Sequence, residues 1–343
     1  MKKASENPTA WKFLALGTEE KHLTNLRQLT FGGDNAEAYW SFDSKSITFQ
    51  SNYSAWGLEC DQIFTAPVSA FADSGYKPGI ISTGSGRTTC SYFMPDNKHI
   101  LFASTHKGNK ACPEVPSNTK GYVWPIYDTY DIFVSDLSGN IVNQLTADSG
   151  YDAEGTVSPD GKSIVFTSTR SGDLELWIMD IDGKNQRQIT KDLGYDGGAF
   201  FSPDSKKLIF RASRPKTEEE IKHYTELLAQ GLVEPTNMEL FTVNVDGSDL
   251  KQITHLGKAN WAPFYHPSGK KILFSSNHAS ARGYDFQLYM INEDGTELEK
   301  ITTESVFNSF PMFSPDGKYL IFSSNRNNGG TRATNLFIAE WKD

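Results

Sequence analysis

Several features that mark common protein classes are scarce in this sequence of 343 residues. Only 3 cysteines are present, and neither a Cys-x-x-Cys nor a His-x-x-x-His spacing occurs, so the usual zinc-binding motifs are missing. No apolar run approaches the length that a bilayer-spanning helix needs. Acidic residues outnumber basic ones by 42 to 33, giving a formal net charge of −9 without any basic stripe. We therefore expect no membrane span and no nucleic-acid partner.

The N-terminus also lacks a recognisable targeting signal. Residues Met1–Asn7 are polar and charged, without the apolar core of a signal peptide. Either the protein is cytoplasmic, or this is the mature sequence of an exported protein with a start methionine added. We expect a periplasmic or secreted protein, with the cytoplasmic alternative open, and interpret residues 1–25 as an N-terminal leader.

What the chain does contain is a repeat, which is clearest in Ser158–Tyr195. This stretch has a tight turn at Ser158–Gly161, apolar runs at Ile164–Phe166 and Leu176–Met179, and a short final run that ends with Gln188–Thr190. Together with a strand that leads into the turn, these runs predict a four-stranded antiparallel unit. Such a unit cannot bury both of its faces alone, so it requires neighbours of the same kind.

The unit recurs six times along the chain. The copies of the turn share one central position, occupied by Asp43, Asp96, Asp160, Asp204, Ser268 and Asp316. Each turn is followed by an apolar run that ends in phenylalanine: Phe49, Phe102, Phe166, Phe210, Phe274 and Phe322. Repeats of this length and content are typical of a β-propeller. We therefore predict an all-β fold, in which residues 26–343 form a single six-bladed β-propeller domain.

The phase of the repeat predicts how the ring closes. Leu26–Thr30 matches the last strand of a blade, whereas the chain ends with Leu336–Trp341, which matches a third strand. The sixth blade thus lacks its outer strand, and we expect the N-terminal segment to supply it, which removes two open sheet edges.

The sequence S-P-D-G-K…F-T-S…R-S-G-D-L-E-L-W…D-G…Q-I-T of Ser158–Thr190, repeated in part at Ser314–Arg326, resembles the repeat of the TolB-like (WD-repeat-like) propellers of the bacterial cell envelope. The resemblance covers residues 26–341. It implies an envelope-associated propeller that binds a ligand or protein partner, without implying TolB's own partner. Similar propellers precede the hydrolase domain of prolyl-oligopeptidase-like enzymes, but the G-x-S-x-G sequence of such a domain does not occur here.

Two departures from the repeat are candidates for function. Residues 215–235 predict a short helix between prolines, because Thr217 can cap it and apolar residues recur at helical spacing. Residues 107–128 predict an irregular loop with several prolines and glycines. Both follow the second strand of a blade, so we expect both on one face, at the mouth of the central channel, with the helix as a lid or docking element.

Two sets of repeated positions are expected to face that mouth. Four residues after each phenylalanine lie Tyr53, His106, Arg170, Arg214, His278 and Arg326. Eight residues before each turn position lie Asn35, Thr88, Asp152, Asp196, Asn260 and Asn308. Guanidinium groups suit anionic ligands, and Asp and Asn suit hydroxyl groups or a cation such as calcium. Alternatively, Arg170 pairs with Asp173 or Glu175 inside its blade, and the Asp and Asn side chains cap turns.

Three further residues are candidate ligand contacts. Glu37 and Glu154 lie two positions further along the inner strands and are expected to project into the channel, either as an acid pair or as a solvated lining. Trp261 suits stacking on a sugar or an aromatic side chain, or packing between blades. His106 and His278 belong to opposite blades, so we do not expect them to share a metal.

The cysteines also leave two alternatives. We expect Cys60, Cys90 and Cys112 on one face of adjacent blades. A disulfide from Cys112 to Cys60 or Cys90 is favoured if the protein is exported, and three reduced thiols are expected if it is cytoplasmic.

These observations predict a monomeric, non-catalytic envelope propeller that binds a protein, saccharide or peptide at the channel mouth. No nucleophile or metal cluster can be assembled from the spacing, so we assign no catalytic residue and no required cofactor. The alternative is a lyase or hydrolase that acts on an acidic oligosaccharide.

Overall fold

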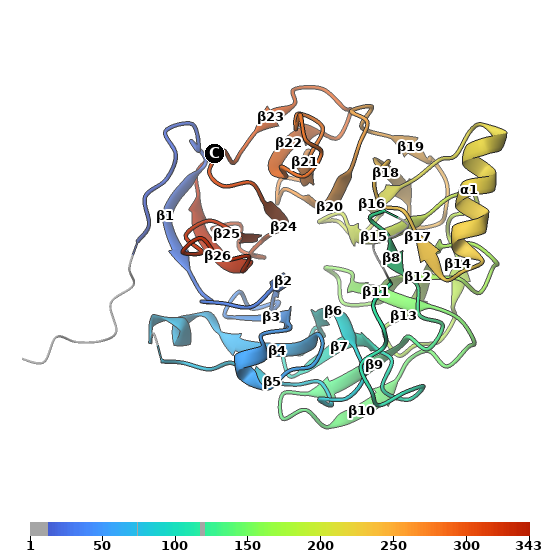
Figure 1. Cartoon of the computed structure of the whole chain (residues 1–343), viewed down its shortest axis with the longest axis horizontal. Coiled ribbons are helices and arrows are strands. Elements are labelled where there is room, and N and C mark those ends of the chain that lie inside the picture. The colour runs from blue at the N-terminus through green and yellow to red at the C-terminus, as the bar shows by residue number, and fades with distance from the viewer. Residues whose placement is uncertain (1–12, 74, 117–120) are drawn as a thin grey trace, which may run out of the picture.

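The computed structural model describes residues 13–73, 75–116 and 121–343, so that part of the expected leader and four residues of the expected 107–128 loop lie outside it. Six four-stranded antiparallel sheets surround a central axis (Figure 1), which confirms the six-bladed propeller. The innermost strands are β2 (Asn35–Trp40), β6 (Thr88–Phe93), β11 (Asp152–Val157), β15 (Asp196–Phe201), β20 (Asn260–Tyr265) and β24 (Asn308–Phe313).

The remaining strands follow in order outward from the axis. The second strands are β3 (Ser46–Ser51), β7 (His99–Ser104), β12 (Ser163–Ser168), β16 (Lys207–Ala212), β21 (Lys271–Ser276) and β25 (Tyr319–Ser324). The third strands are β4 (Gln62–Pro67), β9 (Asp131–Asp136), β13 (Glu175–Asp180), β18 (Glu239–Asn244), β22 (Gln287–Asn292) and β26 (Asn335–Trp341). The outer strands are β5 (Gly79–Ile80), β10 (Ile141–Gln144), β14 (Arg187–Gln188), β19 (Lys251–Gln252), β23 (Glu299–Lys300) and, for the sixth blade, β1 (Leu23–Gln28).

The repeated residues have local structural roles. In the turn of the third blade, the Ser158 hydroxyl donates to Asp160 at 2.7 Å and accepts from the Ser163 amide at 3.0 Å, while Gly161 takes a φ of +71°. The six phenylalanines that end the second-strand runs are fully buried, because each sheet is covered on both faces by neighbouring blades. The turns and the buried rings therefore specify the same unit six times.

The N-terminal strand closes the ring, as predicted. β1 pairs antiparallel with β26, from Leu23 opposite Trp341 to Gln28 opposite Phe337, so the strand begins earlier than Leu26. Figure 1 shows β1 on the outer side of β26, near the C-terminus. The first and last segments of the chain therefore share one sheet.

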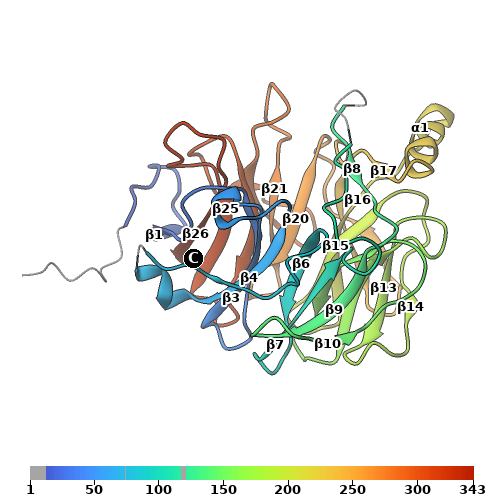
Figure 2. The same ribbon diagram turned by 60° about the horizontal axis from the view of Figure 1, so that its bottom comes forward.

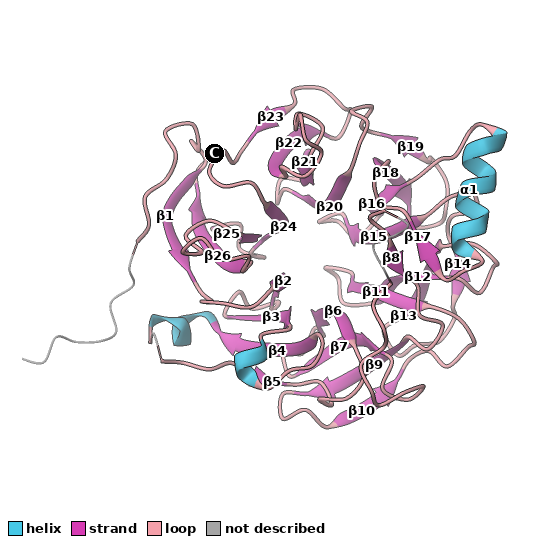
Figure 3. Cartoon of the chain, in the orientation of Figure 1, coloured by secondary structure: helices cyan, strands magenta, loops and turns pink. Residues whose placement is uncertain are grey.

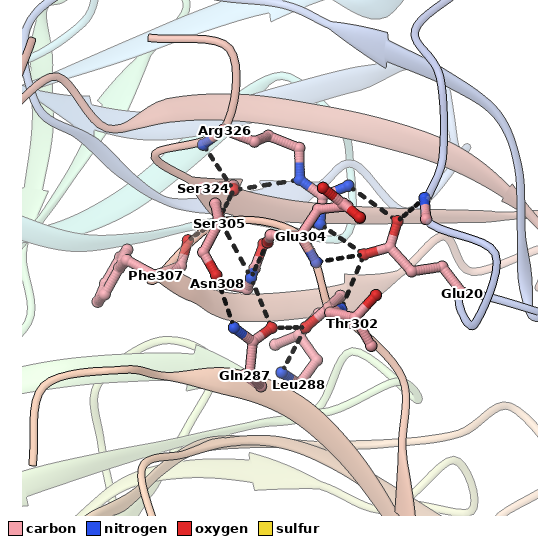
Figure 4. Close-up of polar contacts among 12 residues, drawn as sticks. Glu20, Gln287, Leu288, Thr302, Glu304, Ser305, Phe307, Asn308, Ser324 and Arg326 are labelled. Carbon is pink, nitrogen blue, oxygen red and sulfur yellow. Dashed lines mark hydrogen bonds and ion pairs between the residues drawn. The ribbon is translucent and has the colours of Figure 1, made fainter. Parts of the chain in front are cut away.

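A buried hydrogen-bond network joins the fifth blade to the sixth (Figure 4). Thr302 Oγ1 accepts from the Leu288 amide and donates to Gln287 Oε1, both at 2.8 Å. Gln287 Oε1 also accepts from Asn308 Nδ2 at 2.9 Å, across the seam between the blades. A buried polar side chain on each inner strand can thus be satisfied by the preceding blade.

The same network extends to the segment before β1. Arg326 donates to Asn308 Oδ1 at 3.1 Å and to both carboxylate oxygens of Glu20, the closer at 2.9 Å. Both side chains of this ion pair are buried. Glu20 also accepts from the amides of Thr303 and Glu304, so it fastens the N-terminal segment to the fifth and sixth blades.

The predicted helix is present. α1 (Glu218–Leu228) begins at Thr217, whose hydroxyl accepts from the Glu220 amide while the Glu220 carboxylate accepts from the Thr217 amide. After the helix, β17 (Leu232–Val233) pairs with β8 (Trp124–Pro125) of the second-blade insertion. Figure 2 shows α1, β17 and β8 projecting from one face of the ring, so the two insertions meet there.

Little helix is present elsewhere in the described ranges. Apart from α1, Figure 3 shows two short 3₁₀ turns, Ser54–Trp56 and Val68–Ala72. Among these described residues, no helix has both the length and the apolar character needed to cross a lipid bilayer.

Glu20 should stabilise the fold at neutral pH, and this contribution should be lost in acid. Burial acts to raise the pKa of Glu20, but the hydrogen bonds and charge of Arg326 and the two backbone amides outweigh it, so the pKa lies below its ordinary value of 4.5. Because the folded-state pKa is depressed, this stability is present above pH 4.5 and is lost as the pH falls through the lowered pKa. We expect Glu20→Ala to lower the free energy of unfolding at neutral pH by about 3–5 kcal/mol, since Arg326 would remain buried without a counter-charge.

Urea unfolding at neutral and acidic pH measures this effect. The control is Glu340→Ala, which removes a partly exposed carboxylate from β26 that accepts from Asn25, and we expect it to cost less than about 1 kcal/mol. Equal losses in the two variants would contradict a special role for Glu20.

Candidate functional site

The expected ring of acceptors lies mainly in the seams between blades, while Asn35 and Thr88 also line the cavity described below. Asn35, Thr88, Asp152, Asp196, Asn260 and Asn308 are at most 2% exposed and lie in the seams between blades. Asn260 Nδ2, for example, donates to the Met238 carbonyl of the preceding blade at 2.8 Å. Most of these side chains point into the seams instead of the channel, because the faces of each sheet are covered by neighbouring blades.

The expected cationic ring also lies within the blades. Arg170 pairs with Asp152 at 2.6 Å, and Arg214 pairs with Asp196. Arg326 contacts Asn308, as described above. Pairing within a blade was the alternative interpretation, but the carboxylate partners of Arg170 are Asp152 and, at 2.9 Å, Asp148 instead of Asp173 or Glu175.

The two histidines of this ring make similar contacts. His106 Nδ1 lies 2.8 Å from Ser104 Oγ, and His278 Nδ1 lies 2.9 Å from Ser276 Oγ. Their rings pack on Phe133 and Tyr289. Asp152 and Asp196, the expected calcium ligands, are each already paired with an arginine, and no group of three or more His, Cys, Asp or Glu side chains in the described part of the chain could hold a metal ion.

A different set of residues faces the axis. The third residue of every inner strand has a left-handed backbone, with φ between 47° and 59°, and the pairing register slips at this point in all six blades. These residues are Glu37, Cys90, Glu154, Gly198, Ala262 and Phe310. A bulge turns a side chain out of the regular alternation. The expectation that Glu37 and Glu154 project into the channel is confirmed.

The bulges surround a cavity of about 560 Å³ on the insertion face. Trp124 and Pro125 of β8, followed by Ile126 and Tyr127, lie along one side. Other lining residues are aromatic: Tyr122, Tyr130, Tyr151, Tyr195, Trp261, Phe307 and Phe310. The second-blade insertion therefore forms a roof over the channel mouth, where an aromatic wall meets the bulge carboxylates.

Glu154 is held by a dense set of donors. Its carboxylate pairs with Arg211 and accepts from the Tyr195 hydroxyl at 2.9 Å, the Thr167 hydroxyl at 2.7 Å and the Gly198 amide at 2.9 Å. Burial raises the pKa of Tyr195 well above its ordinary value, so the phenol stays protonated and can donate. Glu154 is thereby fixed in position and its charge is balanced.

Glu37, in contrast, is a carboxylate with an oxygen that lacks a hydrogen-bond donor. It is half-buried, and its Oε2 is shielded from solvent without a hydrogen-bond partner. Burial raises its pKa to about 7, and the charge of Glu154 acts in the same direction, against the lowering effects of Cys90 and Arg211. At neutral pH this group is thus divided between its acid and carboxylate forms.

The tryptophans hold the roof in place. Trp261 Nε1 donates to the Pro235 carbonyl at 2.9 Å, and its ring stacks on Phe286 with centroids 4.3 Å apart. Trp124 lies 5.2 Å from Trp261 and over the Arg211 guanidinium at 5.1 Å. Trp261 therefore packs between blades and insertions while also lining the cavity, so both of its expected roles remain compatible with its position.

A disulfide fastens the roof to the first blade. Cys60 and Cys112 are bonded, with Cα atoms 5.9 Å apart, and Cys90 is free. Of the expected pairings, the structure therefore has Cys112 with Cys60. The bond connects the loop that leads into β8 with the approach to β4, on the rim of the cavity.

Comparison with known proteins agrees with this architecture. A family model described as the TolB beta propeller domain matches residues 224–339. The TolB assigned in Agrobacterium tumefaciens is 20% identical, with 91% of each chain covered and a TM-score of 0.59. The chain therefore has a six-bladed β-propeller fold similar to that of TolB.

Other solved structures share this propeller fold. TolB from Acinetobacter baumannii is 19% identical, with 90% of this chain but 64% of that chain covered and a TM-score of 0.54. The oligogalacturonate lyase of Vibrio parahaemolyticus is 13% identical, with coverages of 92% and 80% and a TM-score of 0.54. No curated protein is significantly similar in sequence. At these identities the likeness establishes the fold alone.

Arg211 was not among the site residues expected from the sequence, although the repeat contains a signal for it. The position after each buried phenylalanine holds Gln50, Ala103, Thr167, Arg211, Ser275 and Ser323. Arg211 is the charged member of this set, and Gly198 is the glycine of the bulge set. The two belong together, because a Cβ at Gly198 would lie 1.8 Å from Arg211 Nη1.

Gly198→Ala should therefore disturb the cavity. Besides the backbone cost at a φ of +59°, the new Cβ would displace Arg211 from Glu154. The matched control is Gly257→Ala, where φ is +69° and a Cβ would meet nothing within 4 Å. We expect the control to cost about 1–2 kcal/mol in unfolding free energy, and Gly198→Ala to cost at least about 2 kcal/mol more. Chemical denaturation compares the two, and equal losses would mean that the Arg211–Glu154 pair moves without penalty.

Proposed function

We propose that this TolB-like propeller is a non-catalytic binding protein of the cell envelope, which holds a ligand or the end of a partner chain in the roofed cavity at the channel mouth. The observation that supports this most strongly is Glu37, an incompletely paired carboxylate that lines a largely aromatic cavity. A shielded carboxylate oxygen without a donor costs free energy, so a ligand that brings a donor would stabilise it. The volume lies within the range of small-ligand pockets, about 300–1,000 Å³.

The proposed ligand contacts differ in part from those expected from the sequence. Asn35, Glu37, Glu154 and Trp261 line the cavity and keep this proposed role. Arg211 and Trp124 join them. The polar residues of the blade seams would act indirectly by holding the inner strands, and the proposed partner remains a peptide, a saccharide or the end of a protein chain.

The helix is proposed to support the roof of the cavity. Tyr224 and Leu227 of α1 are buried, and the Tyr224 hydroxyl donates to Asp173 of the third blade. Through β17, which pairs with β8, the helix is connected to the cavity. A ligand that displaces the roof would therefore move α1 as well.

A lyase or hydrolase acting on an acidic oligosaccharide is the second candidate. Glu37 and Glu154 share the cavity, and a carboxyl group with a pKa of about 7 suits proton transfer near neutral pH. Against this candidate, the Glu154 carboxylate is already paired with Arg211. It also accepts hydrogen bonds from Tyr195, Thr167 and the Gly198 amide. The geometry thus favours binding over turnover.

A ligand screen tests the proposal. Ligand-observed NMR with a mixture of acidic, neutral and basic small molecules and short peptides should give hits that are lost in Ala262→Phe. This substitution fills the cavity from a bulge position and has a precedent in Phe310, the equivalent residue of the sixth blade. Pro203→Ala, an exposed change at the opposite mouth, should retain the hits.

Other results of these measurements would contradict the binding proposal. A screen without hits, or hits that survive Ala262→Phe, would overturn the cavity as the binding site. Release of unsaturated uronides or new reducing ends from short oligogalacturonides, lost in Glu37→Gln, would establish the enzymatic candidate instead.

Location in the envelope is also part of the proposal, and the Cys60–Cys112 bond supports it, because disulfides persist in oxidising compartments. We expect protein purified without reductant and then unfolded to show one free thiol, that of Cys90. Three thiols in native material would contradict an exported, oxidised protein. Cys90→Ser, which should leave no reactive thiol, serves as the control for the assignment.

A further inference from the structure

Acidic side chains outnumber basic ones around the cavity. Four carboxylates line it, on Asp34, Glu37, Asp61 and Glu154, against the two guanidiniums of Arg87 and Arg211. Arg87 pairs with Asp61 at 2.7 Å, and Arg211 pairs with Glu154. Both cations thus have a carboxylate partner, and the acidic excess resides in Glu37 inside the cavity and Asp34 at its exposed rim.

The backbone places Glu37 where a ligand can reach it. Its φ of +53° belongs to the ring of bulges, so its side chain leaves the sheet and enters the channel. An ionised carboxylate can only accept hydrogen bonds, and Oε2 of Glu37 has no donor within the protein. In its ionised form, Glu37 is therefore completed by a group that brings a donor.

The aromatic rings that line the cavity favour one kind of hydrogen-bond donor, a cationic one. Trp124, Tyr130, Tyr151, Trp261 and Phe310 all line the cavity that contains Glu37. The faces of such rings attract cations and also accept apolar groups. An anionic ligand would meet the acidic excess, because each guanidinium already pairs with a carboxylate through a terminal nitrogen, while its Nε lacks a partner. A protonated amine satisfies the carboxylate and the rings together.

We propose that the cavity recognises a ligand that bears a protonated amino group on an apolar body, with Glu37 as the counter-ion and the aromatic rings as the surrounding wall. This inference rests on the proposed binding function and assigns the class of ligand to the same site. The amino end of a peptide and a small arylalkyl amine have the same recognition chemistry, and the probes below distinguish them.

Binding of an amine should release protons near neutral pH. The titratable and charged groups that face Glu37 are Cys90, Glu154, Arg211, Asp61 and Tyr39. Because the pKa of Glu37 is raised to about 7, a part of the population is protonated before the ligand arrives. A bound cation favours the carboxylate and lowers that pKa. For the alkyl and arylalkyl amines, affinity should therefore increase as the pH rises through 7 and level off above it. For the peptide, affinity should fall again above about pH 8, because its amino group has an ordinary pKa of about 7.7–8.0.

Matched probes test the proposal by isothermal titration. We would compare phenethylamine with 2-phenylethanol, n-hexylamine with 1-hexanol, and a tripeptide Phe-Ala-Ala amide with its N-acetylated form. Each amine should bind at least about tenfold more tightly than its uncharged counterpart, as a hydrogen bond to a charged group can provide. Preference for the peptide over the two small amines would identify a chain end as the ligand, and the reverse order would identify a small amine.

Two variants test whether Glu37 is the residue that causes the preference for amines. Glu37→Gln should weaken amine binding about tenfold or more while leaving the alcohols unchanged, and it should abolish proton release. Asp34→Asn, which removes a carboxylate from the exposed rim of the same cavity, should change amine affinity less than about threefold. Thermal melting checks folding, and buffer-dependent heats with the unaltered protein measure proton release independently of any variant.

The outcomes separate this proposal from the one on which it rests. Equal binding of amines and alcohols, equal binding by the unaltered protein and Glu37→Gln, or no binding of any amine would overturn the inference. If neutral or acidic hits from the screen are still lost in Ala262→Phe, the cavity remains a binding site of another class. If no hit depends on the cavity, both proposals fail.

Discussion

In a propeller each sheet has a neighbouring blade against both of its faces, and this constraint determines where side chains can point. Residues that keep regular β geometry on the inner strands enter the seams, which is why Asn260 and Asp196 are fully buried. The left-handed bulge at the third position of each inner strand leaves this geometry and turns that position toward the axis in every blade. The repeated backbone thus supplies six positions at which the sequence can vary without disturbing the ring.

The chemistry of the channel arises where the six blades differ. Gly198 leaves a space that the Arg211 guanidinium fills, and this cation balances Glu154 from the neighbouring blade. Glu37 receives no such partner, so the two acids of the cavity differ in charge and availability. Identical backbone positions therefore carry a fixed carboxylate and an open one. Asymmetry of this kind is what a binding site needs and what a structural repeat alone would not supply.

The roof depends on segments that are far apart in the sequence. β8 comes from the second blade and pairs with β17 from the fourth, while Cys112 is bonded to Cys60 beside the first. Three blades therefore hold one short strand over the channel mouth. The Arg326–Glu20 ion pair closes the ring on the other side. The cavity thus lies within a framework whose ends and insertions are both fastened, which favours a preformed site.

The six blades, the closing strand and the capped helix could be predicted from the sequence, because turn residues, buried phenylalanines and the Thr217 cap act locally. The expectation that Glu37 and Glu154 enter the channel rested on strand alternation, whereas a left-handed bulge is what turns them there. The folded structure alone shows that Arg170 pairs with Asp152, that Arg211 reaches Glu154, and that Trp124 lines the cavity. These contacts depend on which way a strand face turns and on how two insertions meet. Neither is encoded in local spacing, since the first follows from the packing of neighbouring blades and the second from the pairing of β8 with β17.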